Sequence, residues 1–391
     1  MKKEIKNKQE KGITLIALVV TIVVLLILAG VSLSLVIGND GIMKRAKEAK
    51  NRYAEAQTNE EKQLYELANG IDEMETGIKK VDGVPIPEGY YYVGGTKAKG
   101  IVISDNVADK ELDKGKENVR RDLDGNQWVW VPVETPSSLY TTVDAGVALT
   151  GSTGVKTTKY TNSAIISEIE RGLPGSTDYR EPDLVLGSDG TRYDYANYAI
   201  AGFSSLANMA ETMKSDYEEM TKSLEKYKGF YIGRYELTAN GEKTGATQTC
   251  ENGVNWYTLY KNCTTLARGT KVKTRMIWGL QWDATCNWLD ASKFNINNSS
   301  TWGNYDNNTA TGHGNKQITG FSESWKANNI YDFAGNCYEF TQEAGIAGGR
   351  ADRGGGYLYD GSNDPASDRG NCSPLNTTGY YGSRPTLYLI P

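Results

Sequence analysis

The chain has 391 residues, with 43 Lys and Arg against 48 Asp and Glu, so its formal net charge is −5. This length suggests two or three domains, and the nearly balanced charge gives no reason to expect a nucleic-acid partner. The single histidine, His313, excludes a metal site built from several histidines and argues against a Ser-His-Asp triad.

An uncharged apolar run dominates the N-terminus. Residues 13–37 contain no charged side chain, and five lysines precede them: Lys2, Lys3, Lys6, Lys8 and Lys11. A bilayer core of ~30 Å requires ~20 apolar residues in a helix, and a lysine excess marks the cytoplasmic side. The run therefore predicts a single-pass protein of the cell membrane with its C-terminal domain outside. Three kinds of segment fit: a signal anchor, a cleaved secretory signal, or a signal cut before the apolar run.

Short secondary-structure signals follow the apolar run. Residues 42–67 alternate acidic and basic side chains at three- and four-residue spacing, which predicts a polar helix. From residue 84 the chain becomes β-prone, and Trp128, Val129, Trp130 and Val131 predict a buried strand that ends at Pro132. Residues 137–200 are rich in Thr, Ser, Gly and Tyr, which predicts a surface insertion with one short helix near residues 164–171.

The C-terminal half contains the clearest helical pattern. In residues 203–227, Met209, Met213, Tyr217 and Met220 recur at three- or four-residue spacing, and this stripe indicates core packing rather than a cofactor site. A second helix is expected over residues 275–290. Strands are expected in four further segments: residues 230–237, 329–343, 350–361 and 383–390.

The five cysteines allow two interpretations. No Cys-x-x-Cys pair occurs, which excludes zinc sites and thioredoxin-like chemistry of that pattern. Cys250 and Cys263 are close enough in sequence to close a short loop outside the cell. Small buried apolar thiols fit the cysteines equally well.

The N-terminus resembles type IV pilins and pseudopilins. Lys11-Gly12 followed by Ile-Thr-Leu-Ile is similar to the K-G-[FI]-T-L-[IV]-E start of that family. The resemblance implies that a prepilin peptidase cuts after Gly12 and methylates Ile13, and that other pilin-like subunits are partners. Ala17 stands where the family has glutamate, which favours a minor subunit or a pilin-like anchor over a bulk filament subunit. The expected divisions are a basic leader (residues 1–12) and a transmembrane and stalk helix (residues 13–70).

Residues 84–391 resemble the formylglycine-generating-enzyme, or sulfatase-modifying-factor, family. The matching segments are FYIGRYE, QWDATCNWL, NIYDFAGNCYEFT, RGGGY and GYYGSRPTLYL. The resemblance implies an α+β chain in which the long N-terminal helix is followed by a C-type-lectin-like domain with short strands, two helices and many loops.

The same family implies a calcium ion in the AGNCYE segment. The carbonyl oxygens of Gly335 and Cys337 and the side-chain oxygens of Asn336 and Glu339 would be its ligands, because calcium prefers hard oxygen donors. The alternative is that Asn336 and Glu339 only satisfy turn amides. Arg353 and Arg384 would have structural roles beneath the site.

The catalytic pattern of the family is absent. Its oxidases hold copper(I) between two cysteines five residues apart, because soft thiolates suit that ion. Tyr359 and Asp364 occupy those places here, and Cys372 is alone and too far along. A related branch uses iron held by three histidines, which a single histidine excludes. The sequence therefore predicts a scaffold without enzymatic activity.

The C-terminal loop suggests a binding surface instead. Residues 356–382 are dominated by Tyr, Asp, Ser, Asn, Gly and Thr, as paratopes are, and resemble the variable region of proteins diversified by retroelements. The ligand would be an extracellular glycan or protein. The alternative for this segment is an ordinary polar loop. The alternatives for the function of the whole protein are a minor pilin and an oxidase with an altered metal site. The predicted contacts are Tyr357, Tyr359, Asp360, Ser362, Asn363, Asp364, Asp368, Asn371 and Asn376.

Overall fold

The structure, a computed structural model, describes residues 15–37, 42–136, 169–171, 179–181, 195–239, 241, 248–345 and 349–391. The chain separates into two units, Met1–Gly77 and Ile78–Pro391. The secondary structure is a mixture of helices and mainly antiparallel strands, as expected for an α+β chain.

The first unit consists of two helices. Helix α1 (Leu15–Ile37) carries no charged residue, and its described side chains are exposed. Helix α2 (Ile42–Thr76) confirms the predicted polar helix and continues nine residues beyond it. Within the described residues, no helix combines the length and hydropathy needed to cross a membrane. The predicted processing residues Gly12 and Ile13 lie outside the described residues.

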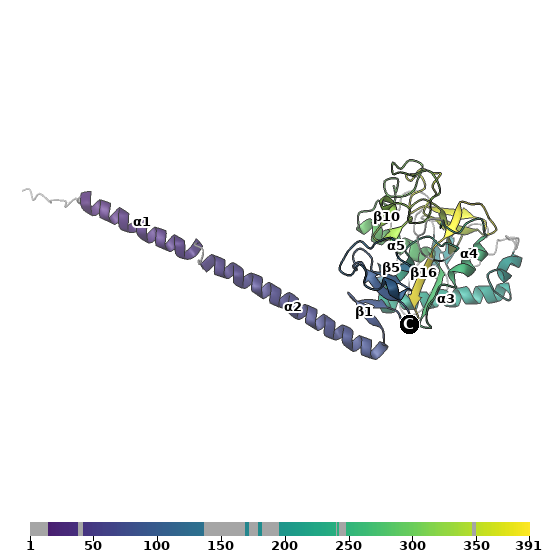
Figure 1. Cartoon of the computed structure of the whole chain (residues 1–391), viewed down its shortest axis with the longest axis horizontal. Helices are drawn as coiled ribbons and strands as arrows, with labels where there is room; N and C mark the ends of the chain where they lie inside the picture. The colour runs from purple at the N-terminus through teal and green to yellow at the C-terminus, as the bar shows by residue number, and fades with distance from the viewer. Residues whose placement is uncertain are drawn as a thin grey trace, which may run out of the picture. The chain divides into compact units, whose positions relative to one another are not determined.

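A six-stranded sheet forms the centre of the second unit. Its strand order is β3-β4-β5-β8-β16-β9, with every neighbouring pair antiparallel. Figure 1 shows β5 and β16 amid helices α3, α4 and α5. The bounds are β3 (Tyr91–Gly94), β4 (Val102–Ser104), β5 (Gln127–Pro132), β8 (Gly229–Gly233), β9 (Val272–Met276) and β16 (Pro385–Leu389).

Both faces of this sheet are buried, which explains why β5 has no polar alternation. Trp128 and Trp130 pack in one hydrophobic cluster, and Val129 and Val131 pack in the other. The first cluster also takes in residues of the hairpin β1 (Lys79–Val81) and β2 (Val84–Ile86), so this hairpin covers one face. The predicted buried strand is therefore confirmed.

Three α-helices belong to the described part of the second unit. Helix α3 (Leu206–Tyr227) begins after Ser205, whose side chain accepts a hydrogen bond from the backbone N–H of Asn208. Its methionine stripe is buried in the larger cluster, which confirms the prediction of core packing. Helix α5 (Gly279–Ala291) starts four residues later than predicted, because Arg275 and Met276 belong to β9. Helix α4 (Trp256–Cys263) was not predicted.

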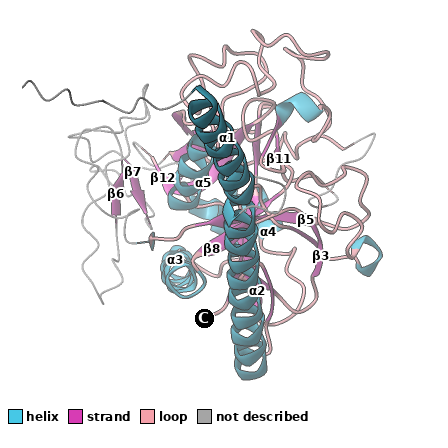
Figure 2. Cartoon of the chain, turned by 90° about the vertical axis from the view of Figure 1, so that its left-hand side faces the viewer, coloured by secondary structure: helices cyan, strands magenta, loops and turns pink. Residues whose placement is uncertain are grey.

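A second sheet lies toward the C-terminus. Its path is β14-β13-β12-β7-β6, and β15 pairs with β12 in parallel. Figure 2 shows β6, β7 and β12 on one side of this unit and β3 on the other. The bounds are β6 (Ile169–Arg171), β7 (Tyr179–Glu181), β12 (Tyr338–Ala344), β13 (Arg350–Arg353), β14 (Arg369–Cys372) and β15 (Tyr381–Ser383); a small hairpin joins β10 (Lys326–Ala327) to β11 (Ile330–Tyr331).

The predicted insertion contributes to this second sheet. Strands β6 and β7 both belong to residues 137–200, and Ala344 of β12 pairs with Arg180 of β7. The helix expected near residues 164–171 is wrong at its end, where Ile169–Arg171 forms β6. The remainder of that expected helix lies outside the described residues.

Candidate functional site

A group of five tyrosines lies where the loop after β13 meets β12 and β15. This group, the tyrosine face, consists of Tyr338, Tyr357, Tyr359, Tyr380 and Tyr381. Tyr359 is 49% exposed and Tyr380 is 41% exposed, and the other three are half-buried. Exposed tyrosines in one place are characteristic of recognition surfaces, because each ring offers apolar area and a hydroxyl at low entropic cost.

Strand pairing and ring contacts hold the tyrosines together. Tyr338 of β12 pairs with Tyr381 of β15, and their rings stack with centroids 5.5 Å apart. The Tyr359 ring meets Tyr338 edge-on at 5.6 Å, and Tyr357 lies 6.1 Å from Tyr380. The face therefore combines side chains from two adjacent strands, the loop after β13 and the turn that precedes β15.

The loop that carries Tyr357 and Tyr359 is tightly constrained at its start. Gly354 and Gly355 follow β13 with φ of +85° and +72°, which L side chains rarely adopt. A Cβ on Gly355 would lie 2.0 Å from the carbonyl oxygen of Asp364. Gly355 thus permits an approach to the Asp364 backbone that a side chain at this position would block.

Further hydrogen bonds fix the middle of the loop. The Asp360 carboxylate accepts from the backbone N–H and hydroxyl of Ser362 and from the Asn307 amide. These bonds lower the pKa of Asp360, the Ser362 hydroxyl contributing most. The backbone N–H of Asp306 donates to the Tyr359 carbonyl, and that of Tyr357 donates to the Asn336 carbonyl. The side chains are therefore presented from a backbone that is already ordered.

The structure divides the predicted contact residues into three groups. Tyr359, Ser362, Asn363 and Asn371 are exposed, and Tyr357, Asp360, Asp364 and Asn376 are half-buried. Asp368 is only 8% exposed, so its prediction as an exposed contact is wrong. It directly precedes β14 and lies two residues after Ala366, which packs into the core.

Two of the predicted residues already have contacts within the protein. The Asn371 side chain on β14 lies against Gly345 and Gly349, and the Asn376 amide donates to the Cys372 sulfur at 3.0 Å. Sequence reasoning missed Tyr338, Tyr380 and Tyr381 as members of the face. The GYYG segment lay within the candidate loop, but the parallel β12–β15 pairing that adds Tyr338 has no local sequence signal.

A buried carboxyl group lies near the tyrosine face. Asp352 of β13 is 4% exposed, and its Oδ1 has no hydrogen-bond partner among the described residues. Burial, followed by the negative charge of Asp368, raises the pKa of Asp352 to about 7. Burial and the charges of Asp368 and Asp360 also raise the pKa of half-buried Asp364.

The two predicted calcium ligands that are side chains, Asn336 and Glu339, already have protein partners. Both carboxylate oxygens of Glu339 accept hydrogen bonds from Arg384, the shortest at 2.6 Å. The Asn336 side-chain oxygen accepts from the Asn304 amide and the Gln317 backbone N–H, each at 3.0 Å. A guanidinium thus occupies the position where a cation would approach Glu339. The residues present do not fit a calcium ion in this arrangement.

Another buried carboxylate, that of Glu236, holds the turn at Asn336 and Cys337. Glu236 accepts from the Asn336 amide at 2.7 Å and from the backbone N–H of Cys337 at 3.0 Å. Burial, together with the negative charges of Asp332 and Glu339, raises the pKa of Glu236 well above its usual range. Glu236, Cys250 and Cys337 approach one another closely enough to suggest a metal site, but their two sulfurs form a disulfide and are not thiolate ligands.

The disulfide joins Cys250 to Cys337, so the Cys250–Cys263 pairing considered from the sequence is wrong. Cys263, Cys286 and Cys372 are buried and take no part in this disulfide, as the thiol interpretation expected. Burial raises the pKa of Cys286 to about 12, which keeps this thiol protonated and unreactive.

The two predicted structural arginines are fully buried. Arg353 donates to Asp283 at 2.6 Å, and Asp283 also pairs with Arg369 at 3.2 Å. Arg384 pairs with Glu339 and donates to the carbonyls of Gly233, Tyr331 and Asp332.

Comparisons with known proteins place the chain in no family. No protein-family model matches it, and no curated protein matches it. Among solved structures, it is similar to Treponema denticola variable protein 1, with 17% identity and a TM-score of 0.28. That match covers 42% of this chain and 85% of the other, and its score is too low to establish a shared fold. The resemblances to pilins and to sulfatase-modifying factors therefore stay predictions.

Proposed function

We propose that the protein is a non-enzymatic binding protein of the cell surface, which captures an extracellular glycan or protein with its tyrosine face. The observation that carries the proposal is the combination of exposed tyrosines and a fixed backbone. The Tyr359 ring is half exposed while the carbonyl of the same residue is held by the N–H of Asp306. A surface that is ordered before binding loses less conformational entropy when its ligand arrives.

The residues at the places of the family's copper ligands favour binding over oxidation. Tyr359 and Asp364 offer a phenol and a carboxyl group, neither of which replaces a soft thiolate. Cys372 is buried, burial raises the pKa of its thiol, and it accepts a hydrogen bond from Asn376. An unreactive thiol does not supply the missing pair.

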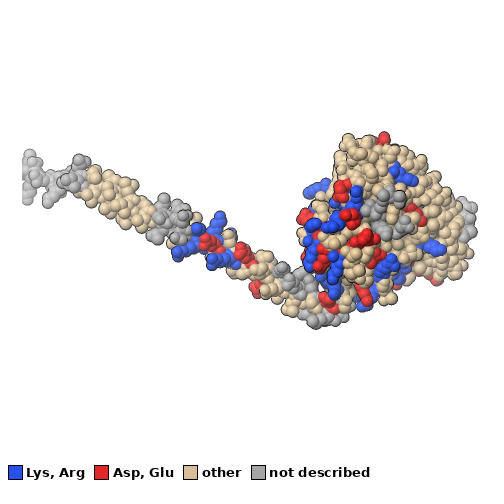
Figure 3. Space-filling model, viewed as in Figure 1, with Lys and Arg blue, Asp and Glu red and all other residues tan. Residues whose placement is uncertain are grey.

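The N-terminal unit is proposed as the anchor. Residues 11–37 carry the pilin-like motif and the uncharged run, and α2 follows as a polar spacer. Figure 3 shows acidic and basic side chains intermixed on α2 and on the visible face of the globular unit. The proposed partners are a prepilin peptidase, other pilin-like subunits and the membrane. N-methyl-isoleucine at position 13 of the mature chain is the expected sequencing result.

A minor pilin is the second candidate, and the length of the two N-terminal helices favours it. Shearing of cells followed by immunoblotting distinguishes the two. The proposed anchor stays in the membrane fraction, whereas a filament subunit is released with the sheared filaments.

The binding proposal is tested with the full chain on a glycan array and on a displayed peptide library. The triple variant Tyr357→Ala, Tyr359→Ala, Asp360→Ala should lose capture of any ligand found, with a melting temperature within a few degrees of the parent. Tyr53→Ala is the matched control, because Tyr53 is an exposed tyrosine on α2. Capture that survives the triple variant would assign binding to another face.

A further inference from the structure

A pocket lies on the same unit as the tyrosine face, between α5 and the end of β5. Its volume is about 550 Å³, within the range of small-molecule pockets, which is ~300–1,000 Å³. Three segments line it: residues 97–98, residues 132–135 and one face of α5. None of the lining residues belongs to the tyrosine face, so this site is independent of the proposed function.

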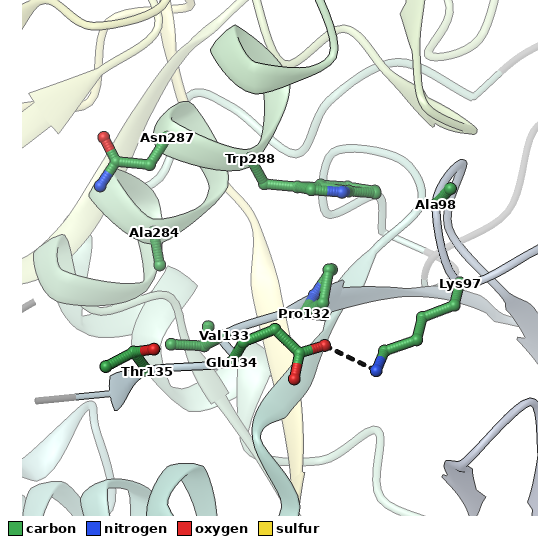
Figure 4. Close-up of a pocket in the computed structure, with 9 residues that line it drawn as sticks. All are labelled: Lys97, Ala98, Pro132, Val133, Glu134, Thr135, Ala284, Asn287 and Trp288. Atoms are coloured by element: carbon green, nitrogen blue, oxygen red, sulfur yellow. Dashed lines mark ion pairs between the residues drawn. The ribbon is translucent and has the colours of Figure 1, made fainter. Parts of the chain in front are cut away.

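The walls of the pocket are mainly apolar and aromatic. Ala284 and Trp288 lie four positions apart on α5, so helical geometry places both on the same face. Figure 4 shows the Trp288 indole edge-on above Pro132 and Glu134, with Ala284 and Val133 to its left. One flat aromatic surface thus forms the roof of the pocket.

An ion pair lies on the side opposite the indole. The Lys97 ammonium is 2.6 Å from Glu134 Oε1, and both side chains are largely exposed, at 45% and 64%. Figure 4 shows this pair beneath the indole ring. It offers hydrogen-bond donors and acceptors while its net charge is zero. Such a pair does not favour an anion or a cation over a neutral molecule.

Asn287 also lines the pocket and is exposed. Figure 4 shows its amide directed away from the indole and from the ion pair. The pocket therefore presents an aromatic face and a pair of charged groups with no net charge. A ligand that matches both has an apolar C–H face on one side and hydroxyl groups on the other.

We propose that this pocket binds a neutral pyranose sugar, as a monosaccharide or as the end residue of a glycan. The ring C–H groups lie on the electron-rich face of Trp288, which attracts their partial positive charge. The hydroxyl groups donate to Glu134 and accept from Lys97, so the ion pair exchanges part of its contact with water for contact with sugar. A neutral hydroxylated ring uses both sides of the pocket, the indole through its C–H groups and the ion pair through its hydroxyl groups.

The test is titration of the full chain with the methyl glycosides of glucose, galactose, mannose and N-acetylglucosamine. Saturation-transfer NMR identifies a bound sugar, and calorimetry gives its Kd. Trp288→Ala should weaken that Kd by about tenfold or more, whereas Trp288→Phe, which keeps an aromatic face, should weaken it less. Circular dichroism and the melting temperature show whether each variant is folded. A folded Trp288→Ala variant with parental affinity overturns the proposal.

A surface substitution tests the ion pair without touching the core. Lys97→Ala should weaken sugar binding several-fold, and Lys114→Ala is its matched control, because Lys114 forms an exposed pair with Glu111 elsewhere. Choline is titrated in parallel as a cationic probe. Binding of choline but of none of the four glycosides overturns the neutral-sugar assignment, as does equal affinity in the Lys97 and Lys114 variants. A negative result in these titrations would not count against capture by the tyrosine face, because the Tyr357, Tyr359 and Asp360 triple variant tests that surface separately.

Discussion

Arg384 and Glu339 form a fully buried ion pair, with Arg384 Nη2 2.6 Å from Glu339 Oε1. Glu339 lies on β12 of the second sheet, and Arg384 immediately precedes β16 of the first. The same guanidinium donates to the carbonyl of Gly233, the last residue of β8. One side chain thus ties the two sheets together.

Loss of this pair should destabilise the fold strongly. Arg384→Met leaves the Glu339 carboxylate buried without its partner, which costs about 3–5 kcal/mol for pairs of this kind. The free energy of unfolding from urea titration measures the effect.

The control for this prediction is Lys114→Met, which breaks the exposed pair with Glu111. Exposed pairs contribute about 1 kcal/mol or less. Equal losses in the two variants would contradict the role assigned to Arg384.

The Cys250–Cys337 disulfide should contribute substantially to stability. It spans 87 residues, and a cross-link over a loop of that size contributes about 4 kcal/mol by restricting the unfolded chain. Cys250→Ser should therefore lower the urea midpoint, and peptide mapping without reductant should recover the linked pair.

The remaining cysteines provide the control for the disulfide. Cys263, Cys286 and Cys372 are buried, so an alkylating reagent should modify them only after unfolding. Rapid alkylation of Cys250 or Cys337 in the native protein would show that the bond is absent.

Stability should depend on pH through Asp352. Its folded pKa is raised to about 7 by burial, while the unfolded value is about 4. Between these values the folded chain holds a proton that the unfolded chain has released, so stability falls as pH rises and then levels off above pH 7. The loss is at most about 4 kcal/mol, since each pKa unit corresponds to 1.36 kcal/mol.

Asp352→Asn removes this titration. The variant should match the parent near pH 4 and be more stable at pH 8, because the amide resembles the protonated acid. Urea titrations at the two pH values measure the difference. Asp122→Asn, at an exposed position, should leave the pH dependence of the parent unchanged. A parent that is equally stable at both pH values would contradict the burial argument.

The fold was predictable where one local pattern determined an element. The buried strand around Trp130 and the methionine stripe of α3 were recognised because their periodicity reflects burial directly. Helix α4 was missed because Trp256–Cys263 is short, and its aromatic residues also suit a strand.

The candidate site was less predictable because it depends on tertiary contacts. The loop of residues 356–382 was identified by composition, but the burial of Asp368 follows from packing that composition does not encode. The partner of Cys250 is 87 residues away, and no spacing rule selects Cys337 over the other three cysteines. The calcium prediction came from a resemblance, which does not reveal that Arg384 already contacts Glu339.

Gly355 should be essential to the shape of the tyrosine face. Gly355→Ala adds a Cβ that would lie 2.0 Å from the Asp364 carbonyl oxygen, at a φ of +72°. Gly253→Ala is a matched control, because Gly253 has a φ of +73° and no atom within 4 Å of the added Cβ. The positive φ alone costs roughly 1–2 kcal/mol, so any greater loss in Gly355→Ala reports the clash. Unfolding titrations measure both losses, and capture by the tyrosine face should fall only in the Gly355 variant. Equal stability and equal capture in the two variants would mean that the close approach of Gly355 to Asp364 does not shape this surface.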